Sequence, residues 1–170
     1  IEASGKLYVA GHYAGDYSAY ISLQRSLRKN TGSLQIGFQN ISRTPSFVAN
    51  ENVTDSIGLK QSLSAFPVSS PGNFNKENTT RVFAVINVPP ADLQITGEYY
   101  LVTNYTYFNS LYTSAQTSAA FNVLHIAAQK KLHVAKNLNW YLEANLQQTT
   151  GNPPVNLPLV LARSRFAFEG

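Results

Sequence analysis

The chain has 170 residues, of which 13% are charged and 12% are aromatic, whereas a typical soluble domain is about 25% charged. Its Lys and Arg residues are scattered and give a net charge of only +4, which argues against nucleic-acid binding. The absence of cysteine excludes a disulfide framework and a thiolate metal site. Asn, Gln, Ser and Thr fill the polar positions, which suits secreted β-proteins and outer-membrane barrels and does not suit a cytosolic enzyme.

Apolar and polar residues alternate along much of the chain. Side chains of a strand point to opposite faces in turn, so this alternation predicts strands with one apolar and one polar face. No apolar run approaches the roughly 18 residues of a membrane-spanning helix. In chain order, the eight predicted strands cover residues 6–14, 17–28, 33–42, 80–88, 93–105, 120–132, 138–147 and 159–168.

The alternation is cleanest in residues 138–147, where the even positions are apolar and the odd positions are Asn, Tyr, Glu, Asn and Gln. A helix of the same residues would spread both sets around its circumference. Residues 120–132 are less clear, because Phe121, Val123 and Ala127 make the second face largely apolar as well.

Short and long links alternate between the predicted strands. Residues 29–32, 89–92 and 133–137 suit tight turns, whereas the links at 43–79, 106–119 and 148–158 are long. Outer-membrane barrels have this asymmetry, with tight periplasmic turns and long external loops. The short link at residues 15–16 breaks the rule. We therefore expect 43–79 to be an extracellular loop, in which a small extra hairpin at 57–66 is disfavoured by the nearby prolines.

Five short motifs carry a family resemblance. They are Ala-Gly-Asp-Tyr at 14–17, Arg-Thr-Pro-Ser-Phe at 43–47, Gly-Glu-Tyr-Tyr-Leu-Val-Thr-Asn-Tyr-Thr-Tyr-Phe at 97–108, Phe-Asn-Val-Leu at 121–124 and Leu-Pro-Leu at 157–159. In this order the chain resembles the putative porin family of Bacteroidota outer membranes. The resemblance implies a longer single-chain β-barrel, of which this chain would be a fragment, and it brings no established catalytic residues.

The fold predicted from these patterns is all-β, an antiparallel up-and-down meander of about eight strands. It would form a single transmembrane β-barrel over residues 1–170, or part of one. Its two faces follow from the alternation. The residues expected to line a pore are Gln24, Gln35, Gln39, Gln94, Thr96, Glu98, Asn139, Glu143 and Asn145. The residues expected to face lipid are Ile21, Leu23, Ile36, Ile95, Leu101, Trp140, Leu142 and Leu146.

The sequence offers little for catalysis. His12, His125 and His133 lack the spacing of metal ligands, so we expect no metal and no cofactor. Glu98 and Glu143 could in principle form an acid–base pair, but on alternating strands they fit a polar lumen better. An embedded Ser–His hydrolase is the enzymatic alternative, and no Gly-x-Ser-x-Gly elbow or Gly-rich phosphate loop favours it. We therefore expect that the chain is not an enzyme.

The function predicted is passive passage of small solutes through a bacterial outer membrane, or a scaffold role in an envelope transport complex. The expected partners are outer-membrane lipids, small solutes and other envelope proteins, and not nucleic acid. A barrel of eight strands alone would be filled by side chains, so a wide pore would belong to a longer protein. The alternatives are a soluble secreted β-sandwich or barrel that binds carbohydrate or protein, and a structural partner of an envelope machine.

Overall fold

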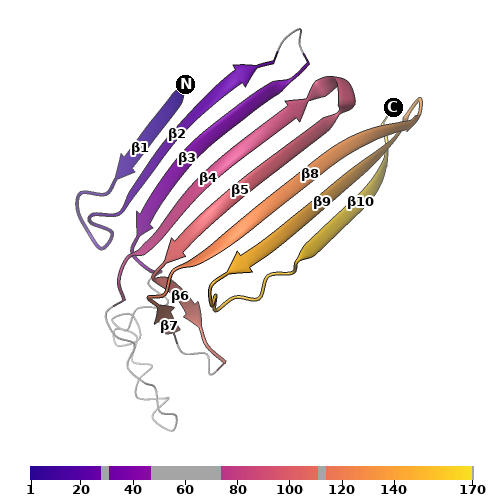
Figure 1. The fold of residues 1–170 in the computed structure, drawn as a ribbon. Coiled ribbons are helices and arrows are strands. Elements are labelled where there is room, and N and C mark those ends of the chain that lie inside the picture. The colour runs from indigo at the N-terminus through magenta and orange to yellow at the C-terminus, as the bar shows by residue number, and fades with distance from the viewer. Residues whose placement is uncertain (28–30, 47–73, 111–113, 170) are drawn as a thin grey trace.

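The computed structural model describes residues 1–27, 31–46, 74–110 and 114–169. Its main feature is a single-layered antiparallel sheet of eight strands (Figure 1). In sheet order these are β1 (Glu2–Leu7), β2 (Tyr17–Ser26), β3 (Ser33–Arg43), β4 (Glu77–Val88), β5 (Leu93–Thr103), β8 (Phe121–Ala135), β9 (Leu138–Thr150) and β10 (Val160–Phe168).

The strands of this sheet lie in chain order, so that each inner strand pairs with the sheet strands before and after it. β8 lies beside β5 because the intervening strands, β6 (Tyr105–Phe108) and β7 (Ser114–Thr117), pair only with each other. The predicted all-β antiparallel meander is therefore confirmed. β1 and β10 are the two edges of the sheet, and they do not pair with each other within the described residues.

The links are sorted between the two ends of the sheet. One end, here called the turn end, carries the links at 27–32, 89–92 and 136–137, with a 3-10 turn at Pro89–Ala91. The other, here called the loop end, carries the links at 8–16, 44–76, 104–120 and 151–159. Residues 47–73 lie outside the described residues, and with them lie most of the loop expected at 43–79 and the disfavoured hairpin at 57–66.

The predicted strand at residues 6–14 is wrong. β1 ends at Leu7, and residues 8–16 form a hydrogen-bonded loop, in which the amide of Tyr8 donates to the carbonyl of Asp16 at 2.9 Å and the amide of Gly15 donates to the carbonyl of Tyr8 at 2.7 Å. Gly11 and Gly15 hold φ values of 84° and 78°, which other residues rarely adopt and which a strand excludes. With this correction, long and short links alternate without the exception expected at 15–16.

The structure adds a small hairpin that the sequence pattern does not predict. β6 and β7 lie in the link expected at 106–119, except that β6 begins at Tyr105, and they are at the loop end of the sheet (Figure 1). Four-residue strands are too short for alternation to stand out from chance. Within the described residues, no helix has the length and apolar character needed to cross a bilayer.

Candidate functional site

The register of the sheet separates polar from apolar side chains. Residues directly opposite each other on neighbouring strands share a face. Gln24 of β2 lies opposite Gln35 of β3, which lies opposite Val85 of β4, and the same row continues through Thr96 to Asn145. All nine residues expected to line a pore lie on this side, here called the polar face: Gln24, Gln35, Gln39, Gln94, Thr96, Glu98, Asn139, Glu143 and Asn145.

The eight residues expected to face lipid lie together on the opposite side, here called the apolar face. Ile21, Leu23, Ile36, Ile95, Leu101 and Leu146 are classed as exposed, with between 37% and 49% of their surface accessible. Trp140 and Leu142 are half-buried. Trp140 stacks on Phe166 with 5.3 Å between ring centroids, and its Nε1 donates to Ser164 Oγ at 2.7 Å. In the described part of the chain this face is therefore uncovered.

The buried apolar side chains belong to the polar face. Among the described residues they are Phe83, Phe121 and Ala127. Phe83 lies opposite Glu98, Ala127 lies opposite Thr96 and Asn145, and Phe121 lies opposite Val102. Phe121, Val123 and Ala127, which made the second face of the strand predicted at 120–132 apolar, thus lie on the polar face of the sheet. Phe121, for example, packs edge-on against Tyr105 of the small β6–β7 hairpin, with ring centroids 5.7 Å apart.

A charged network crosses the middle of the polar face. Arg81 of β4 forms an ion pair with Glu98 of β5. The other Glu98 oxygen, Oε2, accepts from Tyr100 Oη at 3.0 Å and lies 2.9 Å from His125 Nδ1 of β8. The Glu98 side chain is only 12% exposed. A carboxylate with this many partners is held in one orientation, which fixes where its charge lies on the face.

The same network continues onto β9. His125 Nε2 lies 3.0 Å from Asn145 Oδ1, and Asn145 Nδ2 donates to Glu143 at 3.1 Å. Three residues predicted from the sequence, Glu98, Asn145 and Glu143, are thereby linked through a histidine. The network therefore links charged and polar side chains of four neighbouring strands, β4, β5, β8 and β9.

The aromatic ring of Phe83 packs against the guanidinium group of Arg81. The Arg81 guanidinium carbon lies 4.5 Å from the centroid of the Phe83 ring, and Phe83 stacks on Tyr20 at 5.9 Å. Gly37 permits this arrangement, since a Cβ at that position would lie 2.3 Å from Phe83 Cζ. Sequence reasoning did not select Arg81, Phe83 or His125. Alternation within residues 80–88 puts Arg81 and Val82 on different faces, but no pattern within one strand indicates which residues of the neighbouring strands Arg81 contacts.

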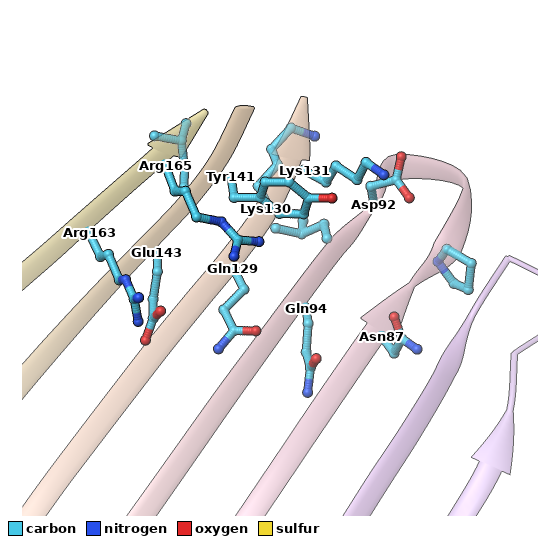
Figure 2. A pocket seen from close by; sticks show the side chains of 13 residues that line it. Asn87, Asp92, Gln94, Gln129, Lys130, Lys131, Tyr141, Glu143, Arg163 and Arg165 are labelled. Carbon is cyan, nitrogen blue, oxygen red and sulfur yellow. The ribbon is translucent and has the colours of Figure 1, made fainter. Parts of the chain in front are cut away.

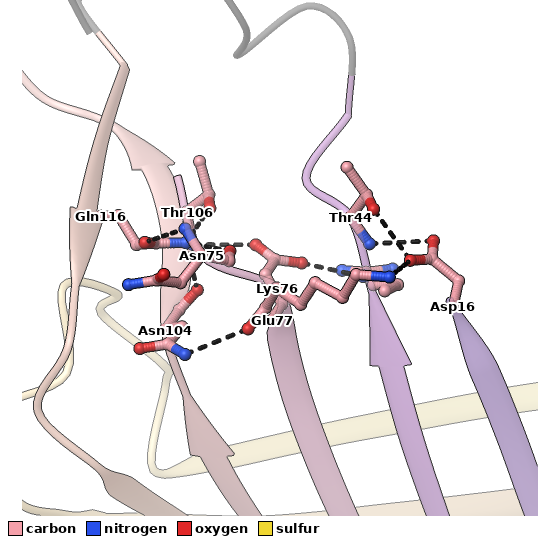
Figure 3. A network of polar contacts seen from close by, with 9 residues as sticks. Asp16, Thr44, Asn75, Lys76, Glu77, Asn104, Thr106 and Gln116 are labelled. Carbon is pink, nitrogen blue, oxygen red and sulfur yellow. Dashed lines mark hydrogen bonds and ion pairs between the residues drawn. The ribbon is translucent and has the colours of Figure 1, made fainter. Parts of the chain in front are cut away.

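A second polar network holds the loop end of the sheet (Figure 3). Asp16 accepts from Lys76 Nζ at 2.8 Å, from the Thr44 hydroxyl at 2.8 Å and from the Thr44 amide at 2.9 Å. Burial by itself would raise the pKa of Asp16, but the hydrogen bonds from Lys76 and Thr44 outweigh it and lower the pKa below its usual value. This carboxylate ties the link before β2 to both ends of the long link between β3 and β4.

Glu77 and Gln116 connect the small hairpin to the main sheet. Glu77 pairs with Arg43 at 2.8 Å and accepts from the Thr106 amide of β6 at 2.8 Å. Gln116 of β7 exchanges two hydrogen bonds with the backbone of Asn75, at 2.9 and 2.7 Å (Figure 3). The β6–β7 hairpin is therefore fastened beside the first residues of β4.

The histidines do not gather into a metal site. His12 packs against Tyr13 at 4.9 Å, and His133 lies at the turn end between Asn139 and Asp92, at 2.7 and 3.0 Å. No group of metal-ligating side chains is found among the residues that the structure covers.

Comparison with known proteins gives one match. A family model described as putative porin matches residues 1–170, the full length of the chain. No curated protein and no solved structure matches it.

Proposed function

The chain belongs to the putative porin family, and on that basis we propose that it forms part of the wall of an outer-membrane β-barrel through which small solutes pass passively. The apolar face would contact lipid, and the polar face would line a hydrated lumen. The partners in this proposal are outer-membrane lipids and small solutes.

One observation carries the proposal: the register places the apolar and polar side chains on opposite faces of a single layer. Lipid chains can contact the apolar face without a free-energy penalty. In water the same large apolar surface would be exposed, which is unfavourable because of the hydrophobic effect. Paired strands also satisfy their backbone groups without water, which the hydrocarbon core demands.

The mechanism is physical and requires no bond to break. Uncharged amides such as Gln35 and Gln39 keep the lumen wet, and the Arg81–Glu98–His125 cluster places both signs of charge at its middle. Passage would then depend on lumen width and on the charges that a solute meets. The edges β1 and β10 must be paired in the membrane, and a wide path needs more than eight strands.

A soluble β-sandwich is a weaker hypothesis for this chain than a membrane barrel. A sandwich buries the apolar faces of two sheets against each other. In the described residues, no second sheet covers the apolar face, and Leu23 and Ile36 are 47% and 48% exposed. The small β6–β7 hairpin lies at the loop end and is not such a layer (Figure 1).

A liposome-swelling assay tests the proposal. Liposomes loaded with an impermeant polymer are diluted into isotonic solutions of uncharged sugars of increasing size, with and without the closed barrel of which this sheet forms part. We expect swelling that slows as the sugar grows. Protein that folds in buffer without detergent, and that produces no swelling, would contradict the proposal.

A matched pair of variants makes the assay specific to the two faces. Leu23→Arg places a charge on the apolar face, and Gln24→Arg places the same charge on the polar face one residue away. A lipid-facing Arg costs about 2–4 kcal/mol near the bilayer midplane. We therefore expect Leu23→Arg to reduce insertion strongly and Gln24→Arg to insert normally.

A further inference from the structure

A hollow of about 510 Å³ lies at the turn end of the polar face. The side chains around it come from β4, β5, β8, β9 and β10 and from the turn that precedes β5 (Figure 2). Basic side chains outnumber acidic ones in this lining: the first group is Lys130, Lys131, Arg163 and Arg165, and the second is Asp92 and Glu143.

Most of these charges already have partners. Lys130 Nζ donates to the Ala91 carbonyl at 2.9 Å, and Lys131 Nζ pairs with Glu169 at 3.0 Å. Asp92 accepts from His133 at 3.0 Å. The charged groups of this lining that remain are the guanidinium groups of Arg163 and Arg165 on β10 and the carboxylate of Glu143 on β9.

Arg163 and Arg165 are next to each other on one face of β10. They lie opposite Glu143 and Tyr141 of β9, and residues two apart on a strand are separated by roughly 6.6 Å. The Arg165 guanidinium carbon lies 4.6 Å from the centroid of the Tyr141 ring, which supports it from one side. Neither arginine has an ion-pair partner within 4.0 Å among the described residues.

We propose that this hollow binds a small solute that carries a doubly charged oxyanion, such as a phosphate group or a pair of carboxylates. A guanidinium presents a planar fork of donors that matches phosphate and carboxylate oxygens. The two guanidinium groups outnumber the single carboxylate of Glu143 in this lining, so a net positive charge remains for the solute. The amides of Gln94 and Gln129, which line the same hollow, supply neutral donors.

The inference names a solute class for the proposed pore, and it rests on that proposal only in taking the polar face to be open to water. Cations at one end of a lumen concentrate anions there and raise their rate of entry. The attraction is electrostatic and weakens as salt screens it.

Calorimetric titration of the folded protein in detergent tests the inference. The probes are inorganic phosphate and succinate, with chloride as the monovalent comparison. We expect saturable binding of phosphate, succinate or both, weakened about tenfold or more in the double variant Arg163→Gln, Arg165→Gln. Which probe binds more tightly identifies the oxyanion.

Arg25→Gln is the matched control, because Arg25 is also near the turn end but shares its row with Leu34 on the apolar face. It should leave binding unchanged, and Glu143→Gln should strengthen binding. Absence of saturable binding by both probes, or equal binding by the double variant shown to be folded, would overturn the inference. The titration needs no conduction, so swelling without binding rejects this inference alone, and binding without swelling rejects the proposed function alone.

Discussion

Two glycines of the sheet differ in how much space surrounds them. Gly37 and Gly97 both lie within strands. A Cβ at Gly37 would overlap the Phe83 ring, at 2.3 Å from Cζ, and would approach the Ile21 carbonyl oxygen at 2.9 Å, whereas a Cβ at Gly97 would meet no atom within 4 Å. Phe83 in turn supports Arg81, so the space left by one glycine determines the geometry of the central network.

Gly37→Ala is expected to destabilise the folded protein by about 1–3 kcal/mol, because Phe83 must leave its stack with Tyr20. Urea unfolding in detergent or liposomes measures the change. Gly97→Ala is the control and should be neutral or slightly stabilising, since alanine is preferred to glycine in a strand. Equal losses from both substitutions would contradict the packing described for Phe83.

Glu98→Gln should also destabilise the protein, by about 1–3 kcal/mol, because Arg81 and His125 lose a charged partner at a largely enclosed position. Glu143→Gln is the matched control, since Glu143 accepts only an amide hydrogen bond from Asn145 among the contacts that the structure describes. The same urea titration compares them. A larger loss for Glu143→Gln would show that the central ion pairs do not hold the polar face together.

Whole elements were predicted where the pattern is long and missed where it is short. Residues 138–147 alternate without a break, and β9 extends to Thr150 with the predicted face assignment. Residues 6–14 offered a partial alternation, but the positive φ values of Gly11 and Gly15 bend the chain there. β6 and β7 depend on contacts with the distant Asn75 and Glu77, which a local pattern does not contain.

Gln116→Ala should loosen the β6–β7 hairpin without affecting the main sheet. The substitution removes both hydrogen bonds to Asn75 as well as the bond from Nε2 to the Asn104 carbonyl at 2.9 Å. Local opening costs little where few contacts hold an element. Hydrogen exchange should therefore accelerate in β6 and β7 and stay unchanged in β4 and β5. Uniform acceleration across the sheet would show that the hairpin is an integral part of it.

The links at the loop end should respond to pH through Asp16. Its folded-state pKa is lowered, so its contribution to stability is fully present above its unfolded pKa and is lost as pH falls toward the folded value. Asp16→Asn should therefore cost about 1.5–3 kcal/mol at neutral pH, and the difference from the unmodified chain should shrink below about pH 4. Urea midpoints of both proteins at neutral and acidic pH measure this. A constant difference across that range would contradict the proposed role of the Asp16 charge.

At the scale of the whole molecule, the eight-stranded sheet is one layer with two chemically different faces, and the sequence predicted these faces best. Alternation alone put Leu142 and Glu143 on opposite sides. It did not place Glu98 beside Arg81 and His125, because that contact depends on the register between three strands. The register, that is, which residues of neighbouring strands lie opposite each other, depends on the turns and on the pairing of the strands. The sequence of one strand alone does not specify it. Alternation within 159–168 likewise puts Arg163 and Arg165 on one face, but it does not show that side chains of β5, β8 and β9 form a hollow beside them.

The central claim is that lipid meets the apolar face and water meets the polar face. The chain contains no cysteine, so single cysteines introduced one at a time over residues 138–147 can each carry a nitroxide label in liposomes. Paramagnetic resonance then compares label collisions with oxygen, which concentrates in lipid, and with a water-soluble nickel chelate. The account predicts a period of two, with oxygen favoured at Leu142 and the chelate favoured at Glu143. The opposite phase, or no alternation, would contradict it.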